Sequence, residues 1–139
     1  MIRIYVKASY DRQSRSGFFY YFSFSNTTGM RNKESGNYEC RNVFQAECKS
    51  VYRALSWWSD QRAIREDFEV ACSPVVAMYL NSVTSKYFKL RSEDDMRAVG
   101  RVSQITAIMG VKVAYTPRRV GDETYVDLEH EIPEAGACH

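Results

Sequence analysis

The chain has 139 residues, the usual length of one domain with a buried core. Hydrophobic residues make up 45% and charged residues 26%, as in soluble globular proteins, and no apolar run approaches the roughly 20 residues that cross a bilayer. The net charge of +2 excludes a protein whose overall charge attracts nucleic acid, so binding of that kind must depend on a local patch. The four cysteines lack metal-binding spacing and favour reduced thiols in the cytoplasm.

The beginning of the chain predicts three mostly antiparallel strands. Phenylalanine and tyrosine, which favour strands, fill residues 18–22 completely. Gly36 in the third segment suggests a bulge. We expect strands over residues 2–6, 18–25 and 30–39, with turns at 11–17 and 26–29.

A helix over residues 42–58 is predicted next. Its apolar residues recur at three- and four-residue intervals, as on one face of a helix: Phe44, Cys48, Val51, Leu55 and Trp58. Glu47 lies on or beside this apolar stripe, where a carboxylate is costly unless something pairs with it. Glu47 therefore reaches solvent, pairs with a nearby arginine, or serves a function.

A short strand over residues 68–72 follows the helix. Because a helix separates this strand from the earlier ones, we expect a parallel crossover connection. Ser73-Pro74 then begins another helix, since serine caps a helix and proline suits its first position.

The last predicted elements are a helix and a strand. Ser92 is followed by three acidic residues, which favour a helix start, and Gly110 ends that helix. Residues 111–115 form the fifth strand. Residues 124–132 are compatible with a helix or a strand, and 133–139 form a loose tail after a single domain spanning 1–132.

This order of elements predicts an α/β fold. Three antiparallel strands come first, and two parallel strands follow, each reached through helices. The expected architecture is a mixed five-stranded sheet with helices packed on it.

The helix over residues 42–58 also carries a recognisable motif. Asn42, then Gln45-Ala46-Glu47, then Tyr52-Arg53-Ala54-Leu55 resembles the first-helix motif of ribonuclease H. The order of predicted elements is that family's order as well. The resemblance implies a ribonuclease H-like fold, in which this glutamate is a ligand of the catalytic metal ions.

The resemblance implies four metal-binding carboxylates, of which Glu47 alone is clearly present. The family's first strand ends in Asp-Gly-Ser, but Lys7-Ala8-Ser9 stands in that place. At the end of the fourth strand Cys72 stands in the Asp position. Pro117-Arg118 matches a pair after the last strand in one branch of the family, and Asp127 is the nearest candidate for the last metal-binding aspartate.

These replacements are unfavourable for metal binding. Two-metal hydrolysis needs anionic oxygens around two divalent ions roughly 3.5–4 Å apart. Magnesium does not accept a thiol in place of a carboxylate, and a lysine puts a positive charge where the ions should sit. We therefore predict a Lys7–Glu47 salt bridge in place of the metal site, and no metal or other cofactor.

The first functional hypothesis is a ribonuclease H-like domain that has lost hydrolysis and works as a binding module. Its ligand would be nucleic acid, such as an RNA/DNA hybrid, or a protein partner. Basic side chains in the first turn, on the central helix and in the last loop would contact phosphates without reading sequence. These candidate contacts are Arg12, Arg15, Lys49, Arg53, Arg118 and Arg119.

Two alternatives stay open. The first is an active magnesium- or manganese-dependent nuclease whose rearranged site draws on Asp11, Glu47, Asp122, Glu123 and Asp127. The second is a structural protein whose aromatic surface docks a partner or a second copy. Trp57 and Trp58 cannot both face the core, because adjacent helix residues point roughly 100° apart.

Overall fold

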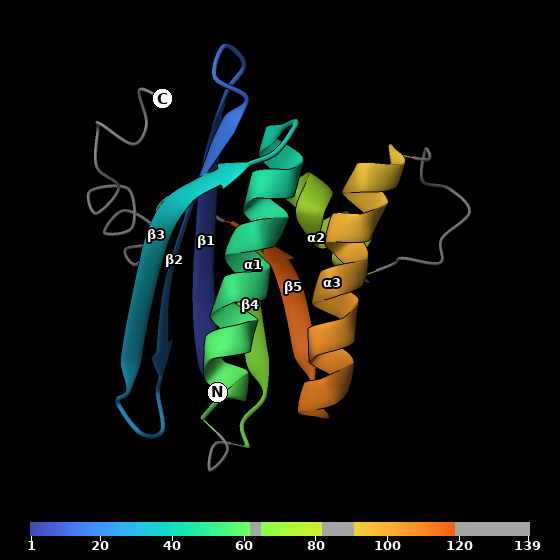
Figure 1. Ribbon diagram of the computed structural model, residues 1–139. Helices are drawn as coiled ribbons and strands as arrows, with labels where there is room; N and C mark the ends of the chain where they lie inside the picture. The colour runs from blue at the N-terminus through green and yellow to red at the C-terminus, as the bar shows by residue number, and fades with distance from the viewer. Residues whose placement is uncertain (62–64, 82–90, 119–139) are drawn as a thin grey trace.

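In the computed structural model, which describes residues 1–61, 65–81 and 91–118, three helices cover one face of a five-stranded sheet (Figure 1). The strand order is β3-β2-β1-β4-β5. The strands are β1 (Ile2–Asp11), β2 (Ser16–Ser25), β3 (Arg31–Glu39), β4 (Phe68–Cys72) and β5 (Val113–Pro117). The helices are α1 (Val43–Ser59), α2 (Pro74–Asn81) and α3 (Glu93–Met109). This is the α/β architecture that the sequence predicts.

The pairing of the strands confirms the predicted topology. β1 pairs antiparallel with β2, and β2 pairs antiparallel with β3. β4 then lies parallel to β1, and β5 lies parallel to β4. α1 is the crossover between β3 and β4, so the parallel connection expected from the intervening helix is confirmed.

Two details of the first three strands differ from the sequence predictions. β1 and β2 extend to Asp11 and Ser16, so the turn between them is shorter than expected. The β2–β3 register runs without interruption, so the bulge predicted at Gly36 is wrong. Gly36 instead faces Phe19: a Cβ built on it would lie 3.1 Å from the Phe19 ring, so the missing side chain leaves room for that ring.

The two faces of β1 have different neighbours. Ile2, Ile4 and Val6 belong to the main core, together with residues of all three helices. Tyr5 alternates with them and packs in a second cluster with Phe18 and Tyr20. Side chains alternate between the two faces of β1. Those of Ile2, Ile4 and Val6 therefore face α1, and that of Tyr5 faces away from it.

Asn42, Ser92 and Gly110 define helix ends. The side chains of Asn42 and Ser92 accept hydrogen bonds from the backbone of Gln45 and Asp95, which caps α1 and α3. Gly110 ends α3 in the left-handed conformation, with φ of 65°.

The start of α3 is joined to the start of α1 by Asp95, which is 3% exposed. Its Oδ1 accepts hydrogen bonds from Asn42 Nδ2 at 2.9 Å and from Gln45 Nε2 at 2.7 Å. Its Oδ2 accepts one from Arg91 Nε at 2.9 Å. This buried network fixes the two helices side by side at their N-terminal ends.

Some predictions lie outside the described residues: the choice of helix or strand for 124–132, the tail 133–139, and the domain limit at residue 132. Among the described helices, none has the length and apolar character needed to span a membrane.

Candidate functional site

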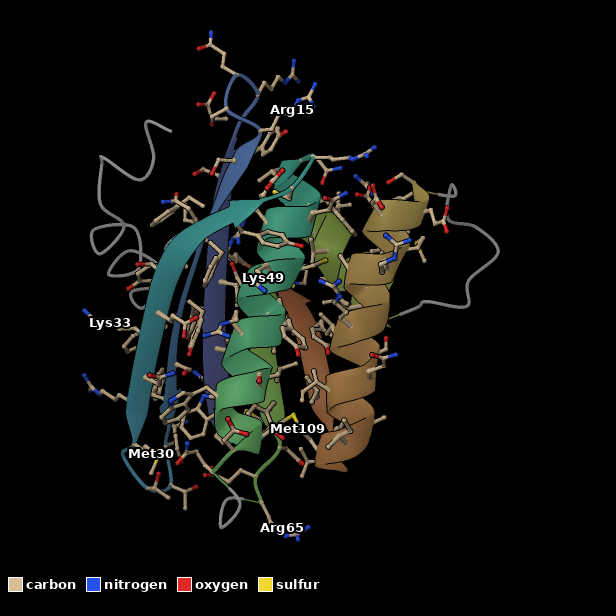
Figure 2. All side chains as sticks on the ribbon, viewed as in Figure 1. Arg15, Met30, Lys33, Lys49, Arg65 and Met109 are labelled. Atoms are coloured by element: carbon tan, nitrogen blue, oxygen red, sulfur yellow. The ribbon has the colours of Figure 1, made fainter. Side chains whose placement is uncertain are left out.

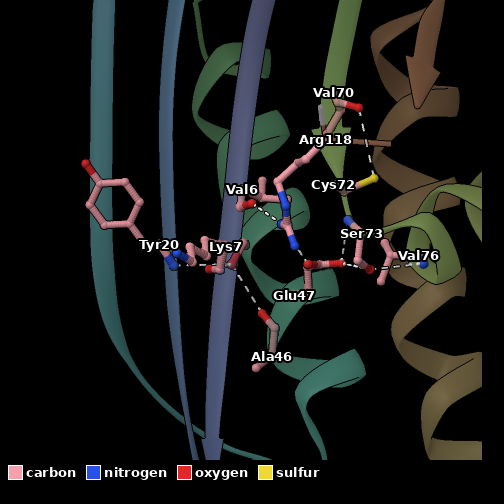
Figure 3. Close-up of polar contacts among 11 residues, drawn as sticks. Val6, Lys7, Tyr20, Ala46, Glu47, Val70, Cys72, Ser73, Val76 and Arg118 are labelled. Atoms are coloured by element: carbon pink, nitrogen blue, oxygen red, sulfur yellow. Dashed lines mark hydrogen bonds and ion pairs between the residues drawn. The ribbon is translucent and has the colours of Figure 1, made fainter. Parts of the chain in front are cut away.

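Glu47 lies in the second turn of α1, and its side chain points toward the ends of β1 and β4 (Figure 3). The side chain is 5% exposed. Oε2 accepts hydrogen bonds from the backbone N–H of Ser73, at 3.2 Å, and from the Ser73 hydroxyl. The Ser73 hydroxyl also accepts a hydrogen bond from Val76 N and so caps α2. The carboxylate is therefore held by the junction between β4 and α2.

Arg118 neutralises Glu47. Its guanidinium Nη1 lies 2.9 Å from Glu47 Oε1 and also donates to the carbonyl oxygen of Val6. The backbone N–H of Arg118 donates to Cys72 O at 2.8 Å, which fixes the residue at the end of β5 beside β4. Both carboxylate oxygens of Glu47 thus have protein donors, one of them a full positive charge.

The predicted Lys7–Glu47 salt bridge is wrong, because the two residues lie on opposite faces of the sheet. Lys7 lies two residues after Tyr5, so the two side chains point to the same face of the sheet. Lys7 also pairs in register with Tyr20, and both tyrosines belong to the second cluster. The β1 residue on the Glu47 side is Val6. The positive charge is supplied by Arg118, which the sequence analysis had assigned to nucleic-acid contacts.

The residues around Glu47 do not suit divalent metal ions. Beside Glu47, Val6 contributes an alkyl group and Cys72 contributes a thiol. Both residues lie one position beyond the register pair Tyr5–Ala71. Burial, and after it the nearby Glu47 charge, raises the pKa of the Cys72 thiol, so Cys72 stays protonated and is a poor ligand and nucleophile. Within the described segments, no three His, Cys, Asp or Glu side chains gather as a metal site would require. Asp127 lies outside those segments.

The acids invoked for a rearranged nuclease site do not converge in the part of the chain that can be described. Asp11 lies five residues beyond Val6 on β1, roughly 16 Å along an extended strand. Two ions that share ligands lie only about 4 Å apart. The Asp11 carboxylate instead accepts hydrogen bonds from Gln13 N and the Ser14 hydroxyl in the turn. Asp122, Glu123 and Asp127 lie outside the described residues.

The candidate nucleic-acid contacts are not one surface. Arg12 and Arg15 lie in the exposed β1–β2 turn. Arg53 pairs with Glu34 through two hydrogen bonds of 2.6 and 2.9 Å. Arg118 is used internally, and Arg119 lies outside the described residues. Of the predicted set, Arg15 borders one cavity and Lys49 borders a second, smaller one.

The cavity beside Arg15 is a groove of about 670 Å³ between the start of α1 and α3. Four arginines line it, namely Arg15, Arg41, Arg97 and Arg101. A small hollow of about 10 Å³ continues it along α1 and shares Tyr38, Gln45, Ala98 and Arg101 with it. Arg15 stands at the tip of the β1–β2 hairpin and Lys49 on the outer side of α1 (Figure 2). Sequence reasoning missed Arg41, Arg97 and Arg101, because the sequence gives no signal that the start of α1 lies beside α3.

The two tryptophans of the third hypothesis are largely internal. Trp58 is 1% exposed and donates from Nε1 to the buried Ser23 hydroxyl at 2.8 Å. Trp57 is half-buried and packs edge to face on Trp58, with ring centroids 4.9 Å apart. No continuous exposed aromatic patch forms from these two tryptophans.

No protein-family model matches the sequence, and no curated protein matches it. Solved structures match its fold. RNase H1 from the halophilic archaeon Halobacterium salinarum NRC-1 has a TM-score of 0.72 at 14% identity, covering 97% of this chain and 96% of that one. LC11-RNase H1, in complex with an RNA/DNA hybrid, has a TM-score of 0.75 at 12% identity, covering 94% and 92%. The N-terminal RNase H domain of a Mycobacterium tuberculosis protein has a TM-score of 0.69 at 10% identity, covering 99% and 98%.

This likeness extends over nearly the whole chain and agrees with the strand order and the crossover. The chain has the ribonuclease H-like fold. The predicted fold and the suspected resemblance are both confirmed.

Proposed function

We propose that this protein is a non-hydrolytic member of the ribonuclease H-like fold that binds nucleic acid. The observation that carries the first half of the proposal is the Arg118–Glu47 ion pair. A guanidinium takes up the carboxylate that a metal ion would need, at the end of the sheet where Val6 and Cys72 offer no further anionic oxygen. Bringing magnesium there would require breaking a buried ion pair and would restore one carboxylate ligand.

Binding of nucleic acid is supported by two observations. One structural neighbour is in complex with an RNA/DNA hybrid, so this fold accommodates such a ligand in that protein. In addition, this chain gathers four arginines around one groove although its net charge is only +2. Guanidinium groups bind phosphates through paired N–H donors, as they bind carboxylates.

The proposal predicts binding without cutting. A labelled RNA/DNA hybrid and its separate strands are incubated with the protein and magnesium or manganese, and cleavage is followed on a gel. Binding is measured in parallel by fluorescence anisotropy over a series of salt concentrations. We expect intact substrate under all metal conditions and an affinity that falls steeply with salt, because phosphate contacts release counterions.

The Glu47→Gln variant is the control for contaminating nuclease. Cutting that persists in Glu47→Gln comes from elsewhere, whereas metal-dependent cutting that Glu47→Gln abolishes would show an active site and overturn the proposal. Absence of binding to every nucleic acid probe would equally contradict it, and would favour a protein partner.

A further inference from the structure

We infer that the arginine groove between α1 and α3 binds one strand of nucleic acid, at a place separate from the Glu47 cluster. The groove is defined by Arg15, Arg41, Arg97, Arg101 and Tyr38. This inference rests on the proposed function and deepens it, because it names the surface and the form of nucleic acid.

The groove carries an excess of positive charge, which favours an anionic ligand. The two acids that line the groove, Glu39 and Asp94, leave the four arginines with an excess of two positive charges. The groove alone thus holds as much net charge as the entire chain. A concave surface with one sign of charge attracts and retains oppositely charged ligands more strongly than the same charges spread over a convex surface.

The guanidinium groups of the groove are available to bind phosphate. Within the described part of the chain, Arg15 and Arg101 form no ion pair, and both are exposed. Arg41 and Arg97 share Asp94, at 3.1 and 2.9 Å, and Arg97 also lies 3.7 Å from Glu93. The Asp94 side chain is 36% exposed and that of Glu93 is 91% exposed. Such surface pairs are weak, so a phosphate can compete for both arginines.

Tyr38 adds an aromatic ring to the lining of the groove. Tyr38 lines the main cavity and its continuation, and Tyr52 lines the continuation. Lys49 Nζ lies 4.9 Å from the centre of the Tyr38 ring and 5.8 Å from that of Tyr52. The continuation holds only about 10 Å³ and Lys49 covers the rings there, so a base can stack on Tyr38 only from the main cavity. Aromatic side chains are surfaces on which unpaired bases stack, and stacked duplex bases do not offer their faces. The groove therefore fits a single strand better than a duplex.

The position of the groove separates it from the Glu47 cluster. Glu47 points from α1 toward β1 and β4 (Figure 3), whereas Lys49, which lines the continuation of the groove, lies on the outer side of α1 (Figure 2). A strand along α1 and α3 thus needs no contact with Arg118. Variants of the groove leave the Arg118–Glu47 pair intact.

The test compares two double variants with the same change in charge. Arg15→Ala/Arg101→Ala removes two groove cations. Arg31→Ala/Arg65→Ala removes two exposed arginines from the other end of the molecule, where Figure 2 labels Arg65 and Met30, the residue before Arg31. Anisotropy is measured with a labelled 20-nucleotide single strand and with the RNA/DNA hybrid of the same sequence. Circular dichroism checks that each variant is folded.

We expect the groove variant to bind the single strand at least about tenfold more weakly than wild type, with the salt slope reduced by about 1.4, from about 0.7 for each lost phosphate contact. The control variant should stay within about threefold of wild type. Asp94→Asn should change affinity in the opposite direction, because it removes a competing carboxylate from the groove.

The inference is overturned if both double variants lose affinity equally, if Asp94→Asn weakens binding, or if the hybrid binds more tightly than the single strand. It is also overturned if polyglutamate of equal charge competes as well as the oligonucleotide, since the groove would then accept any polyanion. Each of these results presupposes that wild type binds nucleic acid. Failure of the proposed function differs from all of them, because wild type would then bind no probe or would cut the hybrid.

Discussion

Arg118→Ala should destabilise the protein by about 3–5 kcal/mol, the cost expected when one partner of a buried ion pair is removed and the other charge stays buried. Glu47 is 5% exposed and, among the described residues, would keep its hydrogen bonds from Ser73 alone. The carbonyl oxygen of Val6 would lose a donor as well. Urea denaturation measures the loss as a lower midpoint.

Arg53→Ala is the matched control. Arg53 also pairs with one glutamate through two hydrogen bonds, but its side chain is 45% exposed and that of Glu34 is 29% exposed. An ion pair in that position contributes about 1 kcal/mol or less. Glu47→Gln, added to Arg118→Ala, should recover part of the lost stability because it removes the unpaired charge. If the two arginine variants were equally stable, the internal role of Arg118 would be refuted.

Asp95→Ala should lower the free energy of unfolding by about 2–4 kcal/mol, because the donors of Asn42, Gln45 and Arg91 lose their shared acceptor. Gln45 is itself buried, so its amide cannot turn to water without rearrangement. Asp94→Ala changes the neighbouring, half-exposed acid and should cost much less. Thermal unfolding of the two variants, measured side by side, gives the comparison. Equal losses would show that the Asp95 network contributes no more than a surface pair.

The same carboxyl group predicts a dependence on pH. Burial disfavours the charged form of Asp95, but the hydrogen bonds from Asn42, Gln45 and Arg91 outweigh burial and lower its pKa below 3.8. Its contribution to stability is therefore complete above that ordinary value and is lost as pH falls through the lower folded-state pKa. Asp95→Asn should accordingly flatten the loss of stability in this acid range.

Much of the fold could be predicted because local chemistry determines it. Ser73-Pro74 and Ser92 begin helices and Gly110 ends one, as their capping and conformational preferences require. Residues 68–72 form a strand over the predicted range because β4 is buried and bounded by polar segments. These signals depend on neighbours within a few residues and need no knowledge of the tertiary structure.

The site was predicted less well because it depends on side-chain direction and on distant partners. Lys7 was assigned to the wrong face, since a shift of one residue on a strand moves a side chain across the sheet. Glu47 was correctly identified as a carboxylate on a buried helix face that needs a partner. That partner, Arg118, is 71 residues away in sequence, and only the parallel pairing of β5 with β4 brings it there.

The most direct test of a guanidinium in place of metal ions is a crystal of the protein soaked in manganese chloride and measured near the manganese absorption edge. We predict no anomalous peak at Glu47, with its carboxylate still bonded to Arg118 and Ser73. Two manganese ions bridged by Glu47, with Arg118 displaced, would contradict that account.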